Sequence, residues 1–229
     1  MKILCALAVK EVVEPAGKAF TAETGEAFDS FFGPVGVLQA KIAAGETADL
    51  AILIPPALEK LQKEGVLAGR FDLGRVGIGI AIREGAARPD FSTPDAFKAM
   101  LLDAPSIALT DPGVGGTAGI YLAGLLERMG IADAIRPKVQ WQKNGFLSAQ
   151  AVADGKAALG MTQVSEIVAV KGAVVAGPLP APLQSITTYC AGIFTASRAQ
   201  DKARAFIDKL LSPALHPRWT AAGFELPGA

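Results

Sequence analysis

The segment from Thr110 to Gly119, TDPGVGGTAG, contains three glycines within four residues, Gly113, Gly115 and Gly116. It follows an apolar run, SIAL, that is typical of a strand, and it precedes a helix pattern, IYLAGLLERMG. Thr117 can cap that helix. Free backbone N–H groups at a helix start, together with the helix dipole, bind anions. The turn is therefore a candidate anion site, with a purely geometric role of the glycines as the alternative.

The same turn is a poor nucleotide motif. It lacks the G-K-[ST] of a P-loop, and it meets the dinucleotide fingerprint only as the variant G-x-G-x-x-A, through Gly113, Gly115 and Ala118. The ribose site would also require an acidic residue that closes a strand about 20 positions further on. Asp133, the nearest candidate, is expected in a loop. The pattern therefore does not favour a nucleotide.

Three further segments place polar or glycine-rich residues directly after a strand pattern. They are ALAVKE (6–11), FFGPVG (31–36) and MTQVSE (161–166). Lys10 puts a cation beside a helix start, and the glycines of the second segment free backbone N–H groups. The third segment presents the side chains of Thr162, Gln163 and Ser165. Ligands of open α/β sheets bind outside the carboxyl ends of strands. Together the four loops predict a site for a small anion.

The elements that position these loops alternate between strand and helix patterns, which predicts an α/β fold with parallel sheets. The first strand is expected over Lys2–Val9. A strand over Arg75–Arg83 has no helix directly before it, and the alternation restarts after it. We therefore expect two α/β lobes, one of residues 1–76 plus about 190–229 and one of about 77–189.

The composition excludes several classes of function. The chain has 22 basic and 22 acidic residues among 229, so no basic surface for nucleic acid is expected. Cys5 and Cys190 lie in apolar runs and are interpreted as small core residues, with a disulfide as a minor alternative. His216 is the only histidine and is interpreted as a surface or packing residue. Neither a metal site nor a cofactor is predicted.

The hydropathy of the sequence indicates whether a membrane span or a signal peptide is to be expected. No apolar run reaches the roughly 18 residues of a membrane span, and the first ten residues have a strand pattern. Neither a membrane span nor a signal peptide is therefore predicted. Two locations remain open: the cytoplasm if Met1 is the native start, and the periplasm if the chain is a trimmed mature form.

Four stretches, taken in order, resemble one known family. They are ALAV, GPVGVLQAKIAAGETADLAIL, ALTDP with GTAG, and ADGKAALGMTQVSE. They resemble the molybdate-binding-protein-like branch of the type II periplasmic solute-binding proteins, and L-Q-x-K-I-A-A-G-x-x-A-D is the most specific match. The resemblance implies two α/β lobes with a ligand cleft between them and two crossover strands, Arg75–Arg83 and Ser185–Thr195, as hinge. It also implies a monomer that delivers a small anion to an ABC importer permease.

The chain departs from that family at three positions. Members that hold molybdate use side-chain hydroxyls where Ala8, Val35 and Gln163 stand here. Each missing buried hydrogen bond to a charge costs roughly 1.5–3 kcal/mol. An organic carboxylate is therefore expected as the ligand rather than molybdate, with Lys10 and Gln163 as polar contacts, although Lys10 could equally face solvent. The expected ligand-binding residues are Ala8, Val9, Lys10, Pro34, Val35, Gly36, Leu53, Gly115, Gly116, Thr117, Ala118, Gln163 and Ser165.

Aconitate isomerase is similar to the same family, which opens an enzymatic alternative. An allylic shift requires groups that accept and return a proton. The candidates are Lys10, Glu11, Asp111 and Glu166. Structural roles remain open for three of them: Asp111 precedes a proline as in a turn, and the two glutamates lie in helix first turns, where the dipole favours carboxylates. The sequence thus predicts a binding protein, with an isomerase of a small unsaturated polycarboxylate as the alternative.

Overall fold

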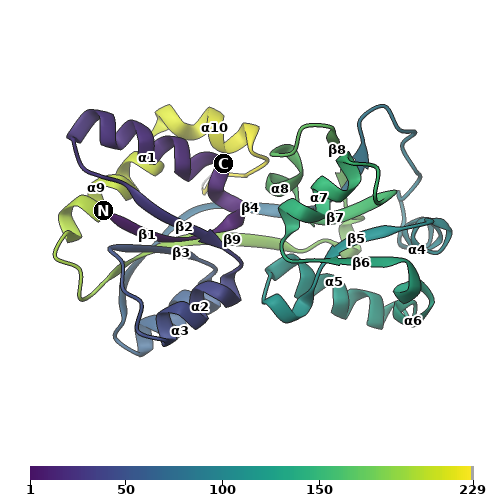
Figure 1. Ribbon diagram of the computed structural model, residues 1–229, viewed down its shortest axis with the longest axis horizontal. Helices are drawn as coiled ribbons and strands as arrows, with labels where there is room; N and C mark the ends of the chain where they lie inside the picture. The colour runs from purple at the N-terminus through teal and green to yellow at the C-terminus, as the bar shows by residue number, and fades with distance from the viewer. Residues whose placement is uncertain (228–229) are drawn as a thin grey trace. The chain divides into compact units, whose positions relative to one another are not determined.

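The computed structural model describes residues 1–227 and divides the chain into two compact units. Unit 1 comprises Met1–Arg75 and the chain from Thr187 onward, and unit 2 comprises Val76–Ile186. The chain enters unit 2 inside strand β4 (Leu67–Arg83) and leaves it at the start of strand β9 (Ile186–Phe194). Each unit has strands covered by helices on both faces (Figure 1). The α/β fold class predicted from the alternating pattern is confirmed.

Unit 1 is built around three parallel strands. Its elements, besides parts of β4 and β9, are β1 (Lys2–Ala6), η1 (Leu7–Val9), α1 (Lys10–Thr24), β2 (Asp29–Gly33), α2 (Val35–Ala43), β3 (Leu50–Leu53), α3 (Pro55–Lys63), α9 (Gln200–Leu210), η5 (Pro213–Leu215) and α10 (His216–Ala221). β1 lies between β2 and β3, and β3 pairs with β9 antiparallel. In Figure 1, α1 and α9 lie on one side of these strands and α2 and α3 on the other.

The strand register brings three helix starts to one edge of unit 1. Ala6 is opposite Gly33, and Cys5 is opposite Ile52. Because parallel strands end side by side, the helices that follow β1, β2 and β3 begin at the same edge. α3 has proline in its first positions, where the missing N–H group costs least.

The first strand is shorter than the predicted Lys2–Val9. β1 ends at Ala6, and η1 forms a single turn that leads directly into α1. Ala8 and Val9 are nevertheless buried, at 6% and 0% exposure. An apolar run of buried residues has no period that separates a strand from a buried turn. The prediction was therefore wrong over these last residues.

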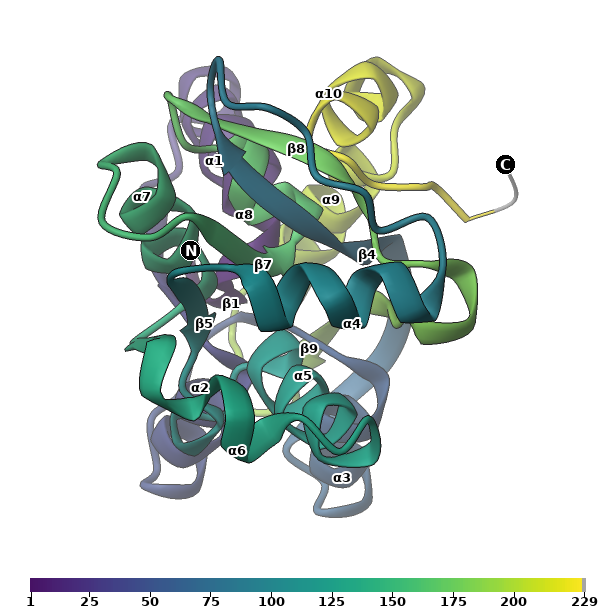
Figure 2. The ribbon, with the colours of Figure 1, turned by 90° about the vertical axis from the view of Figure 1, so that its right-hand side faces the viewer.

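Unit 2 has its own parallel strands, with β5 between β6 and β7. Its elements, besides part of β4, are α4 (Pro94–Asp103), β5 (Ile107–Thr110), η2 (Pro112–Val114), α5 (Thr117–Arg128), α6 (Ala132–Ile135), η3 (Arg136–Lys138), β6 (Val139–Gln142), α7 (Gly145–Ala153), β7 (Leu159–Gln163), α8 (Val164–Val168), β8 (Ala173–Pro178) and η4 (Ala181–Leu183). β4 pairs antiparallel with β7 and with β8. α7 and α8 lie on one side of β5 and β7, and α5 and α6 lie on the other (Figures 1 and 2).

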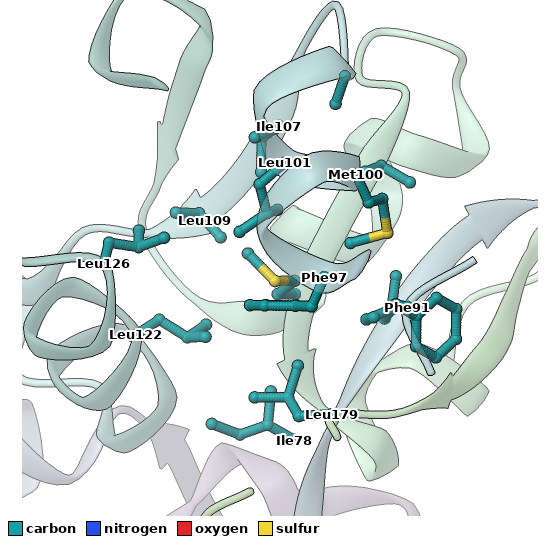
Figure 3. Close-up of a cluster of buried hydrophobic side chains, with 14 of the residues drawn as sticks. Ile78, Phe91, Phe97, Met100, Leu101, Ile107, Leu109, Leu122, Leu126 and Leu179 are labelled. Carbon is teal, nitrogen blue, oxygen red and sulfur yellow. The ribbon is translucent and has the colours of Figure 1, made fainter. Parts of the chain in front are cut away.

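The two faces of the unit 2 sheet carry different cores. On the α4 and α5 face, large side chains such as Phe97, Leu109 and Leu122 fill the space (Figure 3). On the α7 and α8 face the cluster is rich in alanine, including Ala108 and Ala149. Small side chains let a helix approach a sheet closely. α7 is therefore held tightly against β7 and β5, and its first residue lies at the edge where those strands end.

The helix that follows the glycine-rich turn starts one residue earlier than predicted. Gly116, in an extended conformation, is the N-cap of α5, and Thr117 is the first helical residue. The expectation that Thr117 caps the helix is therefore wrong. The turn before it is closed by Asp111, whose Oδ1 accepts the Gly113 N–H at 2.8 Å. Gly115 has φ +74°, a conformation that favours glycine, and this residue completes the turn.

The two cysteines and the histidine lie in different surroundings. Cys5 and Cys190 are both free and buried, which confirms that they are core residues. His216 is an exposed residue at the start of α10. Across residues 1–227, no helix is both long enough and apolar enough to cross a membrane.

Candidate ligand-binding edges

The unit-1 edge consists of residues 7–10, 34–36 and 53–55, which lie at or directly after the ends of β1, β2 and β3. At its centre α2 begins after the N-cap Pro34, and the first helical bond runs from the Leu38 N–H to the Pro34 oxygen at 3.1 Å. The N–H groups of the intervening residues, including Val35 and Gly36, precede any partner within the helix. These groups and the helix dipole give the edge a positive potential.

Lys10 is the cation of the unit-1 edge. Its Nζ lies 3.9 Å from Oε2 of Glu14 and 5.9 Å from the ring centroid of Phe32, and its side chain is 42% exposed. An exposed ion pair at that separation contributes little. The ammonium group can therefore turn to an anion at small cost. Glu11, the neighbouring acid/base candidate, is an exposed residue on the next position of α1.

The remaining predicted residues of the unit-1 edge are apolar. Ala8 and Val35 are 6% and 5% exposed, and Val9 and Leu53 are 0% exposed. The side chains of Val9 and Leu53 belong to the core of unit 1. No hydroxyl is therefore contributed at the two positions where the resemblance implies serines. The polar donors of this edge are backbone N–H groups and Lys10.

The unit-2 edge consists of residues 111–118, 143–145 and 163–166, which lie at or directly after the ends of β5, β6 and β7. Thr110 is opposite Gln142, and Leu109 is opposite Met161, so the three strands end together. After β5 the chain forms the glycine-rich turn and then α5. The first helical bond of α5 joins the Ile120 N–H to the Gly116 oxygen at 3.0 Å.

Gly119 sets how closely α5 approaches the end of β5. A Cβ atom on Gly119 would lie 2.6 Å from the Thr110 oxygen. The backbone N–H groups of Thr117 and Ala118 precede any helical partner and are offered at this edge. Asp111 is exposed and its Oδ1 is bonded to the Gly113 N–H, so its geometry is that of a turn-closing residue.

Glu166 is the acid that the fold holds most firmly at the unit-2 edge. Its Oε2 accepts the hydroxyl of Thr162 at 2.5 Å. Its carboxyl also accepts the backbone N–H groups of Gly145 and Gln163. The bond to the N-cap residue Gln163 is one that a glutamate at the third helical position commonly makes. Burial raises the pKa of Glu166 to about 7, and it outweighs the three hydrogen bonds, which lower it.

Gly145 is part of the same cluster and was not predicted from the sequence, whereas Thr162 was noted as a polar side chain after a strand but not included among the expected ligand-binding residues. A Cβ atom on Gly145 would lie 1.9 Å from the Thr162 Oγ1 and 2.0 Å from the Glu166 Oε2. Only glycine can therefore occupy this position while the cluster keeps its geometry. The available signal was the Asn144–Gly145 pair before an apolar helix pattern, because asparagine is a preferred N-cap. The Asn144 side chain does accept the Leu147 N–H at 2.9 Å.

Two of the predicted polar site residues precede Glu166 in the sequence and are almost fully buried. Gln163 is 2% exposed and Ser165 is 1% exposed. Within residues 1–227, the Ser165 hydroxyl has no hydrogen-bond partner. A buried hydroxyl without a partner costs about 1–3 kcal/mol. The Ser165 hydroxyl is therefore a group that a ligand or water molecule would satisfy.

The fold thus gathers the predicted site residues into two groups. The unit-1 edge holds Ala8, Val9, Lys10, Pro34, Val35, Gly36 and Leu53, and the unit-2 edge holds Gly115, Gly116, Thr117, Ala118, Gln163 and Ser165. Each group lies where parallel strands end and helices begin, as expected for α/β sheets. The described residues contain no group of three or more histidine, cysteine, aspartate or glutamate side chains placed to hold a metal ion.

Comparison with known proteins assigns the family. The family model for bacterial extracellular solute-binding proteins matches residues 1–225. The chain belongs to this family. One relative of this solute-binding protein is an aconitate isomerase from Pseudomonas sp. It is 35% identical to the present chain over 175 residues, which are 75% of the present chain and 65% of that relative. The chain thus matches a little under two thirds of the relative's length.

Solved structures of other binding proteins have the same fold as this chain. The periplasmic molybdate-binding protein of Azotobacter vinelandii has a TM-score of 0.79 at 20% identity over 99% of each chain. The sulfate-binding protein SubI of Mycobacterium tuberculosis H37Rv has a TM-score of 0.76 at 15% identity, over 100% of this chain and 87% of that one. The predicted type II periplasmic binding protein fold and the molybdate-binding-like resemblance are confirmed. At these identities the likeness establishes the fold of this solute-binding protein and not its ligand.

Proposed function

We propose that this solute-binding protein binds a small organic carboxylate rather than molybdate and delivers it to the permease of an ABC importer. The proposal rests chiefly on the unit-1 edge, where Ala8 and Val35 are buried apolar residues. The family description, extracellular, favours a place of action outside the cytoplasmic membrane. Residues 1–75 with about 187–229, and 76–186, are proposed to act as the two lobes.

The unit-1 edge supports a carboxylate over a tetrahedral oxyanion. A molybdate ion has four oxygens that all require donors, and each missing donor costs about 1.5–3 kcal/mol for a charged partner. A carboxylate has two oxygens on an otherwise apolar body. The N–H groups at the start of α2 and the Lys10 ammonium can bind those oxygens, while Ala8 and Val35 contact carbon atoms.

The unit-2 edge supports the same class of ligand on separate evidence. The N–H groups of Thr117 and Ala118 open a helix of 12 residues, long enough for its dipole to favour a negative charge. The Ser165 hydroxyl, which has no partner among residues 1–227, is a further donor. Each edge is therefore suited to a carboxylate, and a ligand with two or three carboxylates could use several of these groups.

A thermal-shift screen tests the proposal. The protein is heated with molybdate, tungstate, sulfate and a panel of dicarboxylates and tricarboxylates, including fumarate and trans-aconitate. A ligand at about 100 times its Kd stabilises the native state by roughly 2.7 kcal/mol. We expect a clear rise of Tm with one or more carboxylates and none with molybdate. A rise with molybdate alone would contradict the proposal.

A second function, the isomerisation of a small unsaturated polycarboxylate, is favoured by two observations. The relative from Pseudomonas sp is an aconitate isomerase. Glu166 has a pKa of about 7. A general acid or base works best when its pKa is close to the pH of the reaction, so this carboxyl is suited to accept and return a proton at neutral pH. In such a reaction a base removes a proton from one allylic carbon, the double bond shifts, and a proton returns to the other end. Atoms and charge balance without a cofactor.

Proton NMR separates the two functions. The protein is incubated with trans-aconitate, and the signals of the cis isomer are followed. Turnover that is lost in Glu166→Gln, but kept in the exposed control Glu127→Gln, would support the isomerase. Binding of trans-aconitate without turnover would support the binding function and contradict the isomerase.

A further inference from the structure

We propose that Glu166 is a ligand-binding residue that acts as a neutral acid: its O–H group donates to a carboxylate of the ligand, so that binding takes up one proton. The inference rests on the proposed carboxylate ligand and deepens it. It concerns the unit-2 edge alone. Under this proposal the unit-2 edge recognises a carboxylate through an acid, in a position where an arginine or lysine would be expected.

The position of the carboxyl is fixed by its neighbours. Thr162 is 0% exposed and its hydroxyl donates to Oε2 of Glu166 at 2.5 Å. The backbone N–H groups of Gly145 and Gln163 also donate to the carboxyl. Gly145 cannot carry a side chain without displacing Oε2. The carboxyl is therefore held at the end of β7 and is not free to swing into solvent.

Among residues 1–227, no charged partner shifts the pKa of Glu166, and the elements packed closest to it carry no cation. The elements packed against α8 are β7, α7 and β8, and none of the three has a charged residue. Within α8, Glu166 is the only charged residue. The adjoining loops of the unit-2 edge contribute Lys143 and Asp111, both of which are exposed. A partly buried carboxyl in such a setting favours its neutral form.

The neutral form suits an anionic ligand. A protonated carboxyl offers one O–H as a donor, and its oxygens keep lone pairs that can still accept from Thr162 and the backbone N–H groups. The ionised form has no donor and repels a second carboxylate. The pKa of about 7 means that both forms are present at neutral pH, so an arriving carboxylate shifts the balance toward the protonated form. Ser165, the preceding residue of α8, has a buried hydroxyl without a partner among residues 1–227, and this hydroxyl is a second neutral donor in the same helix turn.

Isothermal titration calorimetry with trans-aconitate tests the inference. Titrations at pH 8 in phosphate and in Tris, which differ in ionisation enthalpy, give the number of protons taken up. We expect close to one proton per ligand. Affinity should fall about fiftyfold from pH 7 to pH 9, because the protonated fraction falls by that factor when the pKa is about 7. Ordinary carboxyl groups of the ligand, with pKa values near 4, are ionised throughout this range.

Glu166→Gln provides the decisive variant, because an amide keeps a donor and an acceptor but cannot titrate. It should bind trans-aconitate without proton uptake and with an affinity that is independent of pH from 7 to 9. The exposed Glu127→Gln in the same unit should behave as wild type. Circular dichroism checks that both variants fold; should Glu166→Gln fail to fold, the wild-type proton count decides alone.

The outcomes separate this inference from the proposed function. Carboxylate binding with no proton uptake in the wild type would overturn the role of Glu166 and leave the proposed function intact. The same holds if Glu166→Gln keeps the wild-type pH dependence. Failure of every dicarboxylate and tricarboxylate in the panel to bind would overturn both.

Discussion

The Thr162 hydroxyl donates to Oε2 of Glu166 at 2.5 Å, and both side chains close over Gly145. This pair joins the end of β7 to the first turn of α8 and holds an acid at the edge where the strands of unit 2 end. A carboxyl that is fixed in this way, with no charged partner among residues 1–227 that shifts its pKa, has a raised pKa because burial disfavours its charge. The stability and the pH dependence that we expect of unit 2 both depend on this pair.

Gly145→Ala should disrupt the cluster. The new Cβ atom would lie 1.9 Å from the Thr162 Oγ1 and 2.0 Å from the Glu166 Oε2, so one of them must move. Overpacking of this kind costs about 1–3 kcal/mol of the free energy of unfolding. Gly124→Ala is the matched control, since only the flexible end of Arg128 lies nearby, and alanine in a helix should add roughly 0.5–1 kcal/mol. Urea denaturation of both variants measures the difference, and equal stabilities would contradict the packing seen here.

Thr162→Val should raise the pKa of Glu166 above its value of about 7. The Thr162 hydrogen bond favours the ionised carboxyl and so lowers the pKa, and valine removes it while keeping the shape of the side chain. Thr162→Ser retains a hydroxyl and should leave the pKa near its wild-type value. Carbon-13 NMR of the Glu166 carboxyl, followed through a pH titration, reads the pKa in all three proteins. A pKa that is the same in the valine variant would show that the hydroxyl does not act on the carboxyl.

The stability of the protein should depend on Glu166 between pH 4.5 and 7. The pKa of this carboxyl is raised from 4.5 to about 7 by folding, so in that range the folded state binds a proton that the unfolded state does not. The free energy of unfolding therefore falls as pH rises through this window and levels off above it. The full effect is up to about 3 kcal/mol, reduced to the extent that solvent reaches the carboxyl.

Comparison with Glu166→Gln isolates this contribution. The variant lacks the titrating group, so the difference in the free energy of unfolding between wild type and variant should change with pH in the same window. Urea denaturation at a series of pH values gives both curves. Parallel curves from pH 4.5 to 8 would mean that Glu166 titrates as an ordinary carboxyl.

The sequence predicted the fold class and the family because both depend on features that recur along the whole chain. Alternating strand and helix patterns specify parallel sheets with crossover helices, and the quoted motifs extend over most of the chain. The predicted start of α5 was wrong by one residue because glycine and threonine are similarly favourable as N-cap residues, so Gly116 and Thr117 could each have capped the helix. The first strand was overextended because Ala8 and Val9 are buried in a turn.

The Thr162, Gly145 and Glu166 cluster could be predicted only in part. Glu166 was recognised as a candidate acid, since it follows a strand and begins a helix. The role of Gly145 depends on how closely α7 approaches β7, a tertiary distance that the local sequence does not specify. The pKa of Glu166 likewise depends on the absence of charge on β7, α7 and β8, three segments that are separate in the sequence.

Lys10→Ala should weaken carboxylate binding by about tenfold or more, because a hydrogen bond to a charged group contributes roughly 1.5–3 kcal/mol. Lys18→Ala is a matched control: Lys18 pairs with the same Glu14, at 3.6 Å, but its side chain is 75% exposed on a later turn of α1. Calorimetric titration with trans-aconitate compares the two variants. Equal affinities for both would place Lys10 among the ordinary solvent-facing lysines.

The proposed preference for a carboxylate over molybdate is tested most directly by calorimetric titration of one protein preparation with each ligand in turn. Ala8 and Val35 leave the unit-1 edge with backbone N–H groups and Lys10 as its polar donors. We predict measurable binding of at least one dicarboxylate or tricarboxylate and an affinity for molybdate at least a hundredfold weaker. Tight binding of molybdate, with no heat from any carboxylate, would contradict this account.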